Sequence, residues 1–344
     1  MSAILALETS CDDTCAAVLD GGGRLCANVI SSQGVHDRFG GVVPEIASRH
    51  HLELVDLVVE EALREAGMGI EEVETVAATR GPGLVGALLV GFSWAKALAA
   101  ARGLEFAAID HLQGHVAANF IAPVFEPPFV CLIASGGHTL LAHVREHEGF
   151  EVLGSTLDDA AGEAFDKGAR MLGLGYPGGA ALERLAVGGD PGAFELPSGG
   201  TSRSGLGVGK LAFARSLDFS FAGLKTALLY AVRELGESGT AARAADLAAS
   251  YQAAIVGSLI ARAEQALELT GLDRLAVGGG VAANGELRRR LHELGAEVHV
   301  PERVLCTDNA AMIASAARYA PVLAYPEYLP LDVYASGELP GGRS

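Results

Sequence analysis

The 344-residue sequence is poor in cysteine and in aromatic side chains, and it contains one tryptophan. Its cysteines are odd in number and show no CxxC spacing. That pattern argues against a disulfide framework and against a zinc knuckle. We interpret them as small apolar core residues; they are Cys11, Cys15, Cys26, Cys131 and Cys306.

Nothing in the first residues marks export, and the sequence offers no convincing membrane span. The first residues, MSAILALETS, include neither a basic region nor a small-residue cleavage site. The most apolar stretch, residues 84–101, contains Lys96 and follows a Gly-Pro-Gly turn. It is therefore interpreted as a buried helix. We expect a cytoplasmic protein without a membrane partner.

Basic residues are scarce: 25 Lys and Arg stand against 42 Asp and Glu, which gives a net charge of -17. Lys and Arg supply most of the non-specific affinity for nucleic acid. Any nucleic-acid partner must therefore meet a local basic patch or a second protein. Residues 288–290 are three consecutive arginines, which form either such a patch or an ordinary solvated helix face.

Hydrophobic residues make up 50% of the chain and charged residues 19%, enough apolar content for two compact lobes. Residues 4–19 and 129–144 share one design, a strand followed by a polar turn and a second strand. This similarity predicts a duplicated lobe. We expect further strands at 73–78, 105–109 and 275–278, and helices at 44–66, 84–101, 158–172, 220–235 and 241–269.

Strands that alternate with helices predict an α/β fold. We place an N-terminal lobe at residues 1–110, with residues 320–344 packing back on it, and a C-terminal lobe at 111–319. A Gly- and Ser-rich excursion, residues 188–216, interrupts the second lobe. The helix at 44–66 is apolar on one face, so it belongs to the core or to a dimer seam, and we favour the core.

A histidine pair carries the most specific chemistry. His111 and His115 are four residues apart at the start of a helical stretch, so one helix face presents both imidazoles. That spacing suits one metal ion, although two ordinary histidines would show it too. Leu112 stands where the HExxH motif of zinc proteases has its Glu, which disfavours a protease. Asp308 is the candidate third ligand; its alternative role is to cap the following helix.

Two glycine-rich loops suggest a nucleotide site. Residues 135–139 (SGGHT) lie between strands and expose backbone N–H groups that could bind phosphate. Residues 278–284 (GGGVAAN) end a strand, allow close approach of a flat ligand and offer Asn284 as a hydrogen-bonding partner. A ribose diol could bind to the carboxylates of Asp166 and Glu183 and to the backbone at Gly179. Each carboxylate taken alone is equally typical of a solvated helix surface.

Ten stretches occur in an order that closely resembles the TsaD (formerly Gcp) family of tRNA threonylcarbamoyladenosine transferases. They are LALETSCDDT, GGVVPEIASRHHL, RGPGLVGALLVG, DHLQGHVAA, IASGGHT, LDDAAGEAFDK, GYPGG, DFSFAGLKTA, GGGVAAN and CTDNAAMIA. The resemblance covers nearly the whole chain. It implies the duplicated, two-lobed α/β fold with a central cleft that actin, sugar kinases and Hsp70 share.

The resemblance also implies site residues. His111, His115 and Asp308 would bind one divalent metal per subunit, Fe(II) first and Zn(II) as the alternative. The substrate adenylate would be bound by Ala134, Ser135, Gly136, Gly137, His138, Asp166, Gly179, Glu183 and Asn284. Ala134 is added by the resemblance alone. Asp12 and Asp13, in the first hairpin turn, are our candidates for orienting or deprotonating the attacking amine.

The family's reaction transfers a threonylcarbamoyl group from threonylcarbamoyl-AMP to N6 of the adenosine at tRNA position 37 and releases AMP. The resemblance implies tRNA as substrate, and a TsaB-like paralogue and a TsaE-like ATPase as partners. The alternatives are an ATPase or kinase of the same fold, which would bind Mg²⁺ through carboxylates, and a non-catalytic member of the same complex. Neither alternative needs the histidine pair.

Overall fold

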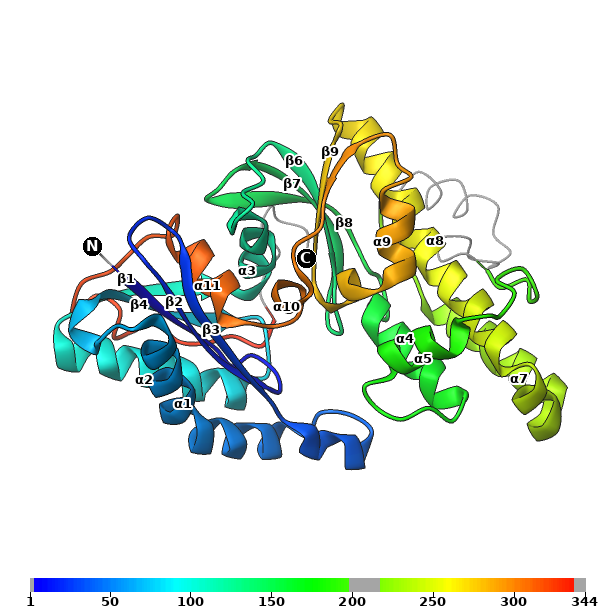
Figure 1. The fold of residues 1–344 in the computed structure, drawn as a ribbon, viewed down its shortest axis with the longest axis horizontal. Coiled ribbons are helices and arrows are strands. Elements are labelled where there is room, and N and C mark those ends of the chain that lie inside the picture. The colour runs from blue at the N-terminus through cyan, green and yellow to red at the C-terminus, as the bar shows by residue number, and fades with distance from the viewer. Residues whose placement is uncertain (1–2, 198–216, 337–344) are drawn as a thin grey trace. The chain divides into compact units, whose positions relative to one another are not determined.

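The computed structural model describes residues 3–197 and 217–336. The chain forms two compact units, each with its own mixed β-sheet (Figure 1). Unit 1 comprises residues 1–127, 145–150 and 301–344, and unit 2 comprises residues 128–144 and 151–300. Of the excursion expected at 188–216, residues 198–216 lie outside the described residues.

The sheet of unit 1 has the strand order β3-β2-β1-β4-β5. β1 pairs antiparallel with β2 and parallel with β4, and β1 and β2 consist almost entirely of buried residues. This confirms the first hairpin that the sequence predicted. The strands are β1 (Ala3–Glu8), β2 (Asp13–Leu19), β3 (Leu25–Ser32), β4 (Val73–Gly81) and β5 (Glu105–Asp110).

The sheet of unit 2 repeats this topology. Its order is β10-β9-β6-β7-β8, and its central strand β6 also pairs antiparallel with the next strand, β7, and parallel with β9. Two units with one strand order confirm the predicted duplication. The strands are β6 (Phe129–Ala134), β7 (Thr139–Glu146), β8 (Gly149–Ser155), β9 (Arg274–Gly278) and β10 (Glu297–His299).

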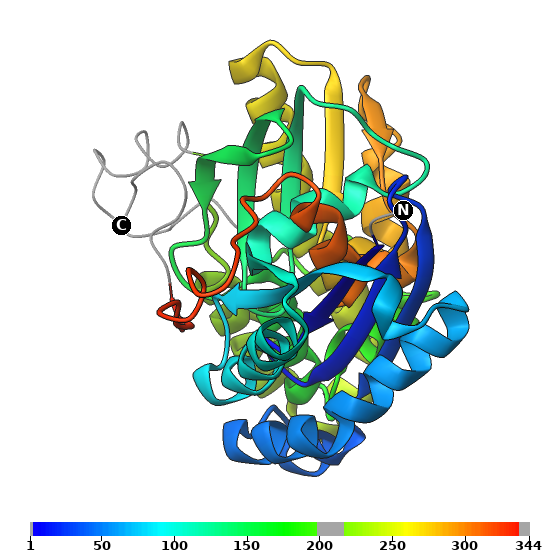
Figure 2. The same ribbon diagram turned by 90° about the vertical axis from the view of Figure 1, so that its left-hand side faces the viewer.

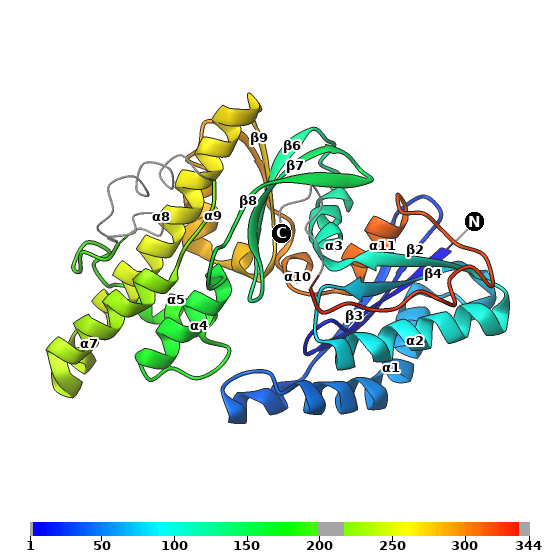
Figure 3. The same ribbon diagram turned by 180° about the vertical axis from the view of Figure 1, so that it is seen from behind.

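Helices cover both faces of the first sheet. α1 (Pro44–Ala66) and α2 (Val85–Arg102) pack side by side on one face, and α3 (His111–Ala117) and α11 (Ala310–Ala317) lie on the other (Figures 1 and 3). The short helices of this unit are η1 (Gly34–Phe39), η2 (Ile70–Glu72), η3 (Ala118–Phe120) and α10 (Arg303–Cys306). In Figure 2, α1 runs along the face of the strands β1 to β3.

The unit boundaries differ from those that we expected from sequence. Residues 111–127 and 301–319 belong to unit 1, whereas the sequence-based division assigned them to the second lobe. The reason is packing: α11 is buried along its whole length against β1, β2 and α3. In addition, the Ser315 hydroxyl donates to the Ala117 carbonyl at 2.8 Å.

The described end of the chain, residues 320–336, belongs to unit 1 and packs on its helices and strands. Leu323 and Phe106 exchange two backbone hydrogen bonds of 2.9 Å each, beside β5. The Lys96 ammonium donates to the carbonyls of Leu329 and Leu331, at 2.8 Å each. This segment therefore follows the surface made by α2 and β5.

In unit 2, α4 (Ala161–Met171), α5 (Gly178–Ala186), α7 (Ala222–Ala242) and α8 (Ala244–Thr270) pack against one another. The long, largely buried α8 also contacts β6 and β9. Asn284 begins α9 (Gly285–Leu291) after the short turn η4 (Gly280–Ala283). The arginine run at 288–290 lies on α9, where Arg289 pairs with Glu286 and Glu293. Arg289 therefore has acidic partners on its own helix.

α1 belongs mainly to the core. Val55, Val58 and Ala62 are buried in the cluster beneath the first sheet, whereas Leu52 and Leu57 are exposed. α2 and α8 are long and apolar enough to cross a membrane by length and composition alone. That is weak evidence, because core helices of water-soluble proteins pass the same test, and 61% of the α8 window is buried.

Candidate metal centre and ligand loops

The histidine pair lies on the first turns of α3, whose start is fixed by Asp110. The Asp110 carboxylate accepts hydrogen bonds from the backbone N–H groups of Leu112 and Gln113, at 2.8 and 3.1 Å, as an N-cap does. The spacing of four residues places His111 and His115 on one helix face, and both are buried. Their ring centroids are 4.7 Å apart.

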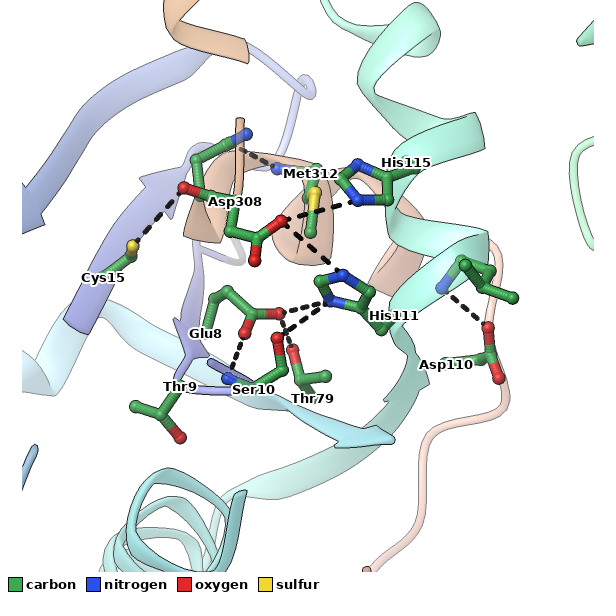
Figure 4. Close-up of polar contacts among 12 residues, drawn as sticks. Glu8, Thr9, Ser10, Cys15, Thr79, Asp110, His111, His115, Asp308 and Met312 are labelled. Atoms are coloured by element: carbon green, nitrogen blue, oxygen red, sulfur yellow. Dashed lines mark hydrogen bonds and ion pairs between the residues drawn. The ribbon is translucent and has the colours of Figure 1, made fainter. Parts of the chain in front are cut away.

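A glycine between the two histidines lets α11 come close. A Cβ on Gly114 would lie 2.8 Å from Cδ1 of Ile313, on α11. The residues just before α11 are therefore brought beside the histidines. Asn309 is the N-cap of α11, because its side chain accepts from the N–H of Met312 at 3.0 Å. The capping role that we considered for Asp308 thus falls to its neighbour, and the Asp308 carboxylate points toward the imidazoles (Figure 4).

One carboxylate oxygen lies close to both imidazoles. Oδ1 of Asp308 is 3.6 Å from Nε2 of His111 and 3.5 Å from Nε2 of His115. Two ligands bonded at about 2.1 Å to one tetrahedral ion lie about 3.4 Å apart. The three side chains offer ligand atoms within 4.8 Å of one another. Two imidazoles and one carboxylate therefore fit a divalent transition metal and leave coordination positions open for a substrate.

Burial and mutual charge shape the protonation of this cluster. Burial raises the pKa of Asp308, and the nearby carboxylates of Glu8, Asp13 and Asp12 add to the rise, which the charge of His111 opposes. For His111, burial lowers the pKa, but the charges of Asp308 and Glu8 outweigh it and raise the pKa above its usual value. Metal binding at this cluster must therefore displace protons.

The candidate catalytic pair, Asp12 and Asp13, follows β1 in the same unit. The β1–β2 turn is fixed by His51, which contacts the carbonyl of Cys11 through Nε2 at 3.0 Å and the hydroxyl of Thr14 through Nδ1 at 2.8 Å. Burial raises the pKa of Asp13 to about 6; a hydrogen bond from Ser32 opposes this rise, and the charge of Asp12 adds to it. The charges of both aspartates also raise the pKa of Asp308, so the pair lies near the cluster.

The structure adds contacts that the sequence did not reveal. Glu8, at the end of β1, is fully buried and lies 3.0 Å from Nδ1 of His111. Tyr334 donates its hydroxyl hydrogen bond to the carboxylate of Asp110 at 2.5 Å, so the described C-terminal segment contacts the cap of α3. The sequence signal for Glu8 was its position, because it is an acidic residue at the end of an otherwise apolar strand. Nothing in the sequence pointed to Tyr334.

In unit 2, both glycine loops leave the carboxyl ends of parallel neighbours, β6 and β9. Ser135 and His138 close the first loop: the N–H of Ser135 donates to the His138 carbonyl at 2.8 Å. Among the described residues, a Cβ on Gly136 or Gly137 would meet no heavy atom within 4 Å. Ligands of open α/β sheets bind at this end of the strands, and the loop backbone there is unobstructed.

The second loop needs glycine for a different reason. Gly279 has φ +87°, and a Cβ there would lie 2.4 Å from the carbonyl oxygen of Ala134. Only glycine accepts both the left-handed backbone and this contact. The close approach brings the two loops of unit 2 together.

The other predicted ligand residues of unit 2 are structural as well. The Asp166 carboxylate accepts from the N–H groups of Gly178 and Gly179, at 2.8 and 3.2 Å, at the start of α5. Glu183 accepts from the N–H of Gly285 at 2.8 Å. Asn284 caps α9 through its oxygen and donates through its amide to Gln252, at 2.9 Å. The side chains of Asp166, Glu183 and Asn284 thus each fix a loop or a helix start.

The family model described as TsaD, tRNA N6-adenosine threonylcarbamoyltransferase, matches residues 24–315. The chain belongs to this family. A transferase of the same name from Pelobacter propionicus is 46% identical over 98% of this chain and 97% of its own length. The one from Symbiobacterium thermophilum is 50% identical over 92% of this chain and 91% of its own length.

The fold comparison agrees with the family. Component A of the (R)-2-hydroxyglutaryl-CoA dehydratase of Acidaminococcus fermentans matches with a TM-score of 0.55 and 17% identity, over 93% of this chain and 98% of that one. Such low identity supports the fold alone. The transferase therefore has the duplicated α/β fold of the actin, sugar kinase and Hsp70 type that the sequence predicted.

Proposed function

We propose that this family member carries out threonylcarbamoyl transfer with one divalent metal bound by His111, His115 and Asp308. The observation that supports the metal is the buried cluster of two imidazoles and one carboxylate, with ligand atoms within 4.8 Å of one another. Two histidines and one carboxylate are typical of Fe(II) sites with open positions and of catalytic Zn(II) sites. We propose Fe(II), with Zn(II) as the alternative.

As a member of this family the chain is an acyltransferase that forms threonylcarbamoyladenosine in tRNA. In the proposed reaction, N6 of adenosine 37 attacks the carbamoyl carbon of threonylcarbamoyl-AMP. A C–N bond forms, the bond between that carbon and the AMP phosphate oxygen breaks, and AMP leaves with the electron pair. The amine loses one proton to a base. The tRNAs served would be those that read codons beginning with A.

In unit 1, the bound metal would supply a Lewis acid that stabilises negative charge on the reacting carbonyl or phosphate. Asp12 and Asp13 are proposed to orient the attacking amine and to accept its proton. Asp13 suits the second role because its pKa of about 6 is nearer to neutral than that of an ordinary carboxylate.

In unit 2, we propose that the loops bind the adenylate. Residues 134–138 would donate backbone N–H groups to the phosphate, which the open side of Gly136 and Gly137 permits. The ribose hydroxyls would contact Asp166 and Glu183, each of which has a second carboxylate oxygen besides the one bonded to a backbone N–H. Gly179 and Asn284 would border the nucleoside.

The partners proposed for this chain are tRNA, a TsaB-like paralogue and a TsaE-like ATPase, in the cytoplasm. A net charge of -17 makes strong tRNA binding by this chain alone unfavourable, so the partners would contribute to the tRNA surface. Leu52, Leu57 and Leu89 are exposed on α1 and α2. They would offer the paralogue an apolar surface away from the buried ligand cluster.

The test is direct. Purified chain, synthetic threonylcarbamoyl-AMP, unmodified tRNA and the two partners are incubated, and the digested tRNA is analysed for threonylcarbamoyladenosine by mass spectrometry. His111→Ala is compared with wild type, and His50→Ala, a histidine on the half-exposed surface of α1, serves as the matched control.

We expect the modified nucleoside with wild type and with His50→Ala, and almost none with His111→Ala. Absence of product with wild type, while an established family member succeeds with the same tRNA, would contradict the transferase. Full activity of His111→Ala would contradict the metal-dependent step alone.

A further inference from the structure

The buried carboxylate of Glu8 has no role in the reaction described above. It ends β1 with 0% of its surface exposed. A buried carboxylate is costly unless it is fully hydrogen-bonded, and this one has several partners (Figure 4). The N–H of Ser10 donates to Oε1. The hydroxyl of Thr79 donates to Oε2 at 2.5 Å.

The remaining partner of Glu8 is a candidate metal ligand. Oε2 of Glu8 lies 3.0 Å from Nδ1 of His111, and the Ser10 hydroxyl oxygen lies 3.2 Å from the same nitrogen. The carboxylate can only accept a hydrogen bond when ionised. Both oxygens of Glu8 accept from other donors, Oε1 from the N–H of Ser10 and Oε2 from the hydroxyl of Thr79, so Glu8 is also the acceptor in its contact with Nδ1. Nδ1 of a neutral His111 therefore carries the proton.

The tautomer decides which nitrogen can bind metal. A neutral imidazole with its proton on Nδ1 has its lone pair on Nε2. Nε2 is the nitrogen that lies 3.6 Å from Asp308. Glu8 and Asp308 thus contact opposite nitrogens of one ring, so Glu8 orients a ligand and is not itself a fourth one.

We propose that Glu8 is a positioning residue that fixes His111 in the Nδ1–H tautomer and so prepares Nε2 for metal. The inference rests on the proposed metal site. Carboxylate partners of this kind orient ligating histidines in many metalloproteins, and their loss typically lowers metal affinity about 10- to 100-fold.

The isosteric change Glu8→Gln tests the tautomer sharply. The N–H of Ser10 is a fixed donor, so the amide oxygen of Gln must face Ser10 and the amide NH₂ must face His111. An NH₂ donor requires an acceptor, which moves the ring proton from Nδ1 to Nε2. The variant then blocks the metal-binding nitrogen while the volume of the side chain stays the same.

Two readouts are measured. The ¹⁵N chemical shifts of the His111 ring, recorded on the metal-free protein with a neutral ring, identify the protonated nitrogen. Competition with a chelator gives the dissociation constant for Zn(II). Asp12→Asn is the matched control, because it removes one negative charge from the same turn and leaves the Glu8 carboxylate in place. Thr79→Val, which removes one donor to Glu8 but keeps its charge, is the second variant should Glu8→Gln fold poorly.

We expect an Nδ1–H ring in wild type and an Nε2–H ring in Glu8→Gln. Zn(II) affinity should fall about 10- to 100-fold in Glu8→Gln, more than in Asp12→Asn, with a smaller loss in Thr79→Val. An unchanged tautomer, or an affinity loss no larger than that of Asp12→Asn, would overturn the proposal. Absence of metal binding by wild type would instead overturn the proposed metal site, and the ring tautomer would still decide what Glu8 does.

Discussion

The candidate ligand Asp308 of unit 1 and the predicted substrate residues Asp166 and Asn284 of unit 2 all lie close to the start of a helix in space, but their side chains are used differently. Before α11, Asn309 makes the cap and Asp308 is left to face the imidazoles. In unit 2, Asp166 accepts from the first N–H groups of α5 from its place on α4, and Asn284 caps α9, so these side chains make the helix-start hydrogen bonds themselves. An acidic or amide side chain near a helix start can therefore either bind a ligand or hydrogen-bond to the helix backbone. Where a neighbouring residue makes the cap, as Asn309 does, the carboxylate stays available as a ligand.

This difference predicts that changes in unit 1 mainly alter metal affinity, whereas changes in unit 2 alter stability together with substrate binding. The largest effect should come from Asp308→Asn. We expect metal affinity to fall by about 100- to 1,000-fold, beyond the 10- to 100-fold typical of outer partners, with little loss of stability. Chelator competition and thermal unfolding measure the two quantities.

The neighbour of Asp308 supplies the control. Asn309→Ala should lower stability by about 0.5–2 kcal/mol, because it removes the N-cap of α11, and should affect metal affinity less than Asp308→Asn does. If both variants lost metal and stability equally, the division of roles between these neighbours would be wrong.

The second prediction concerns the close contact between the loops of unit 2. Gly279→Ala should lower the free energy of unfolding by about 2–4 kcal/mol, since alanine is strained at φ +87° and meets the Ala134 carbonyl. Gly136→Ala, where the described residues leave open space, should change stability by less than about 0.5 kcal/mol and weaken AMP binding. Urea unfolding would compare the stability of the two variants, and calorimetric titration would compare their affinity for AMP. Equal stability losses would contradict the inference that Gly279, and not Gly136, is required by close packing.

A third prediction uses the raised pKa of Asp13. Burial raises it from 3.8 to about 6, so the folded state binds the proton more tightly than the unfolded state does. This contribution to stability is fully present below pH 3.8 and is lost as the pH rises through 6. Asp13→Asn should therefore be more stable than wild type at pH 7.5, by on the order of 1–3 kcal/mol, and nearly equal to it at pH 4.

Urea unfolding at the two pH values checks this prediction, and nucleoside analysis measures activity in parallel. A variant that is stabilised but inactive would support Asp13 as the proton acceptor. A variant no more stable than wild type at pH 7.5 would show that the buried charge is better compensated than we infer.

The smallest expected effect is that of Asp166→Ala. Loss of the acceptor for Gly178 and Gly179 should cost about 1 kcal/mol of stability and weaken AMP binding as well. Glu163→Ala, on the exposed side of the same helix, should change stability by less than about 0.5 kcal/mol. Thermal unfolding compares them. Weaker AMP binding without any stability loss would make Asp166 purely a ligand.

Much of the fold was predictable from periodicity. Residues 44–66 match α1, and the paired hairpins match β1–β2 and β6–β7, because long amphipathic or apolar segments carry strong signals. The strands β3, β8 and β10 were missed. β3 has a single buried residue and β10 is three residues long, so neither shows a clear alternation. β8 does alternate, but it begins with glycine and contains a second one, which weakens the strand signal. The unit boundary was misplaced because α11 is remote in sequence from the sheet that it covers.

The candidate metal ligands were predictable from local sequence patterns. His111 and His115 follow from a helix period, and Asp308 came from its place before a helix. The roles of Glu8 and Thr79 depend on a register between β1 and β4, which no local pattern specifies. The hydrogen bond between Asn284 and Gln252 joins residues 32 positions apart, so no local pattern predicts it either.

The most direct test of the metal centre is anomalous diffraction from crystals of the Fe(II)-loaded chain, recorded at the iron edge. We expect one strong peak within about 2.0–2.2 Å of Nε2 of His111, Nε2 of His115 and a carboxylate oxygen of Asp308. A peak at other residues, or none in protein that forms threonylcarbamoyladenosine, would contradict the metal-dependent mechanism proposed here.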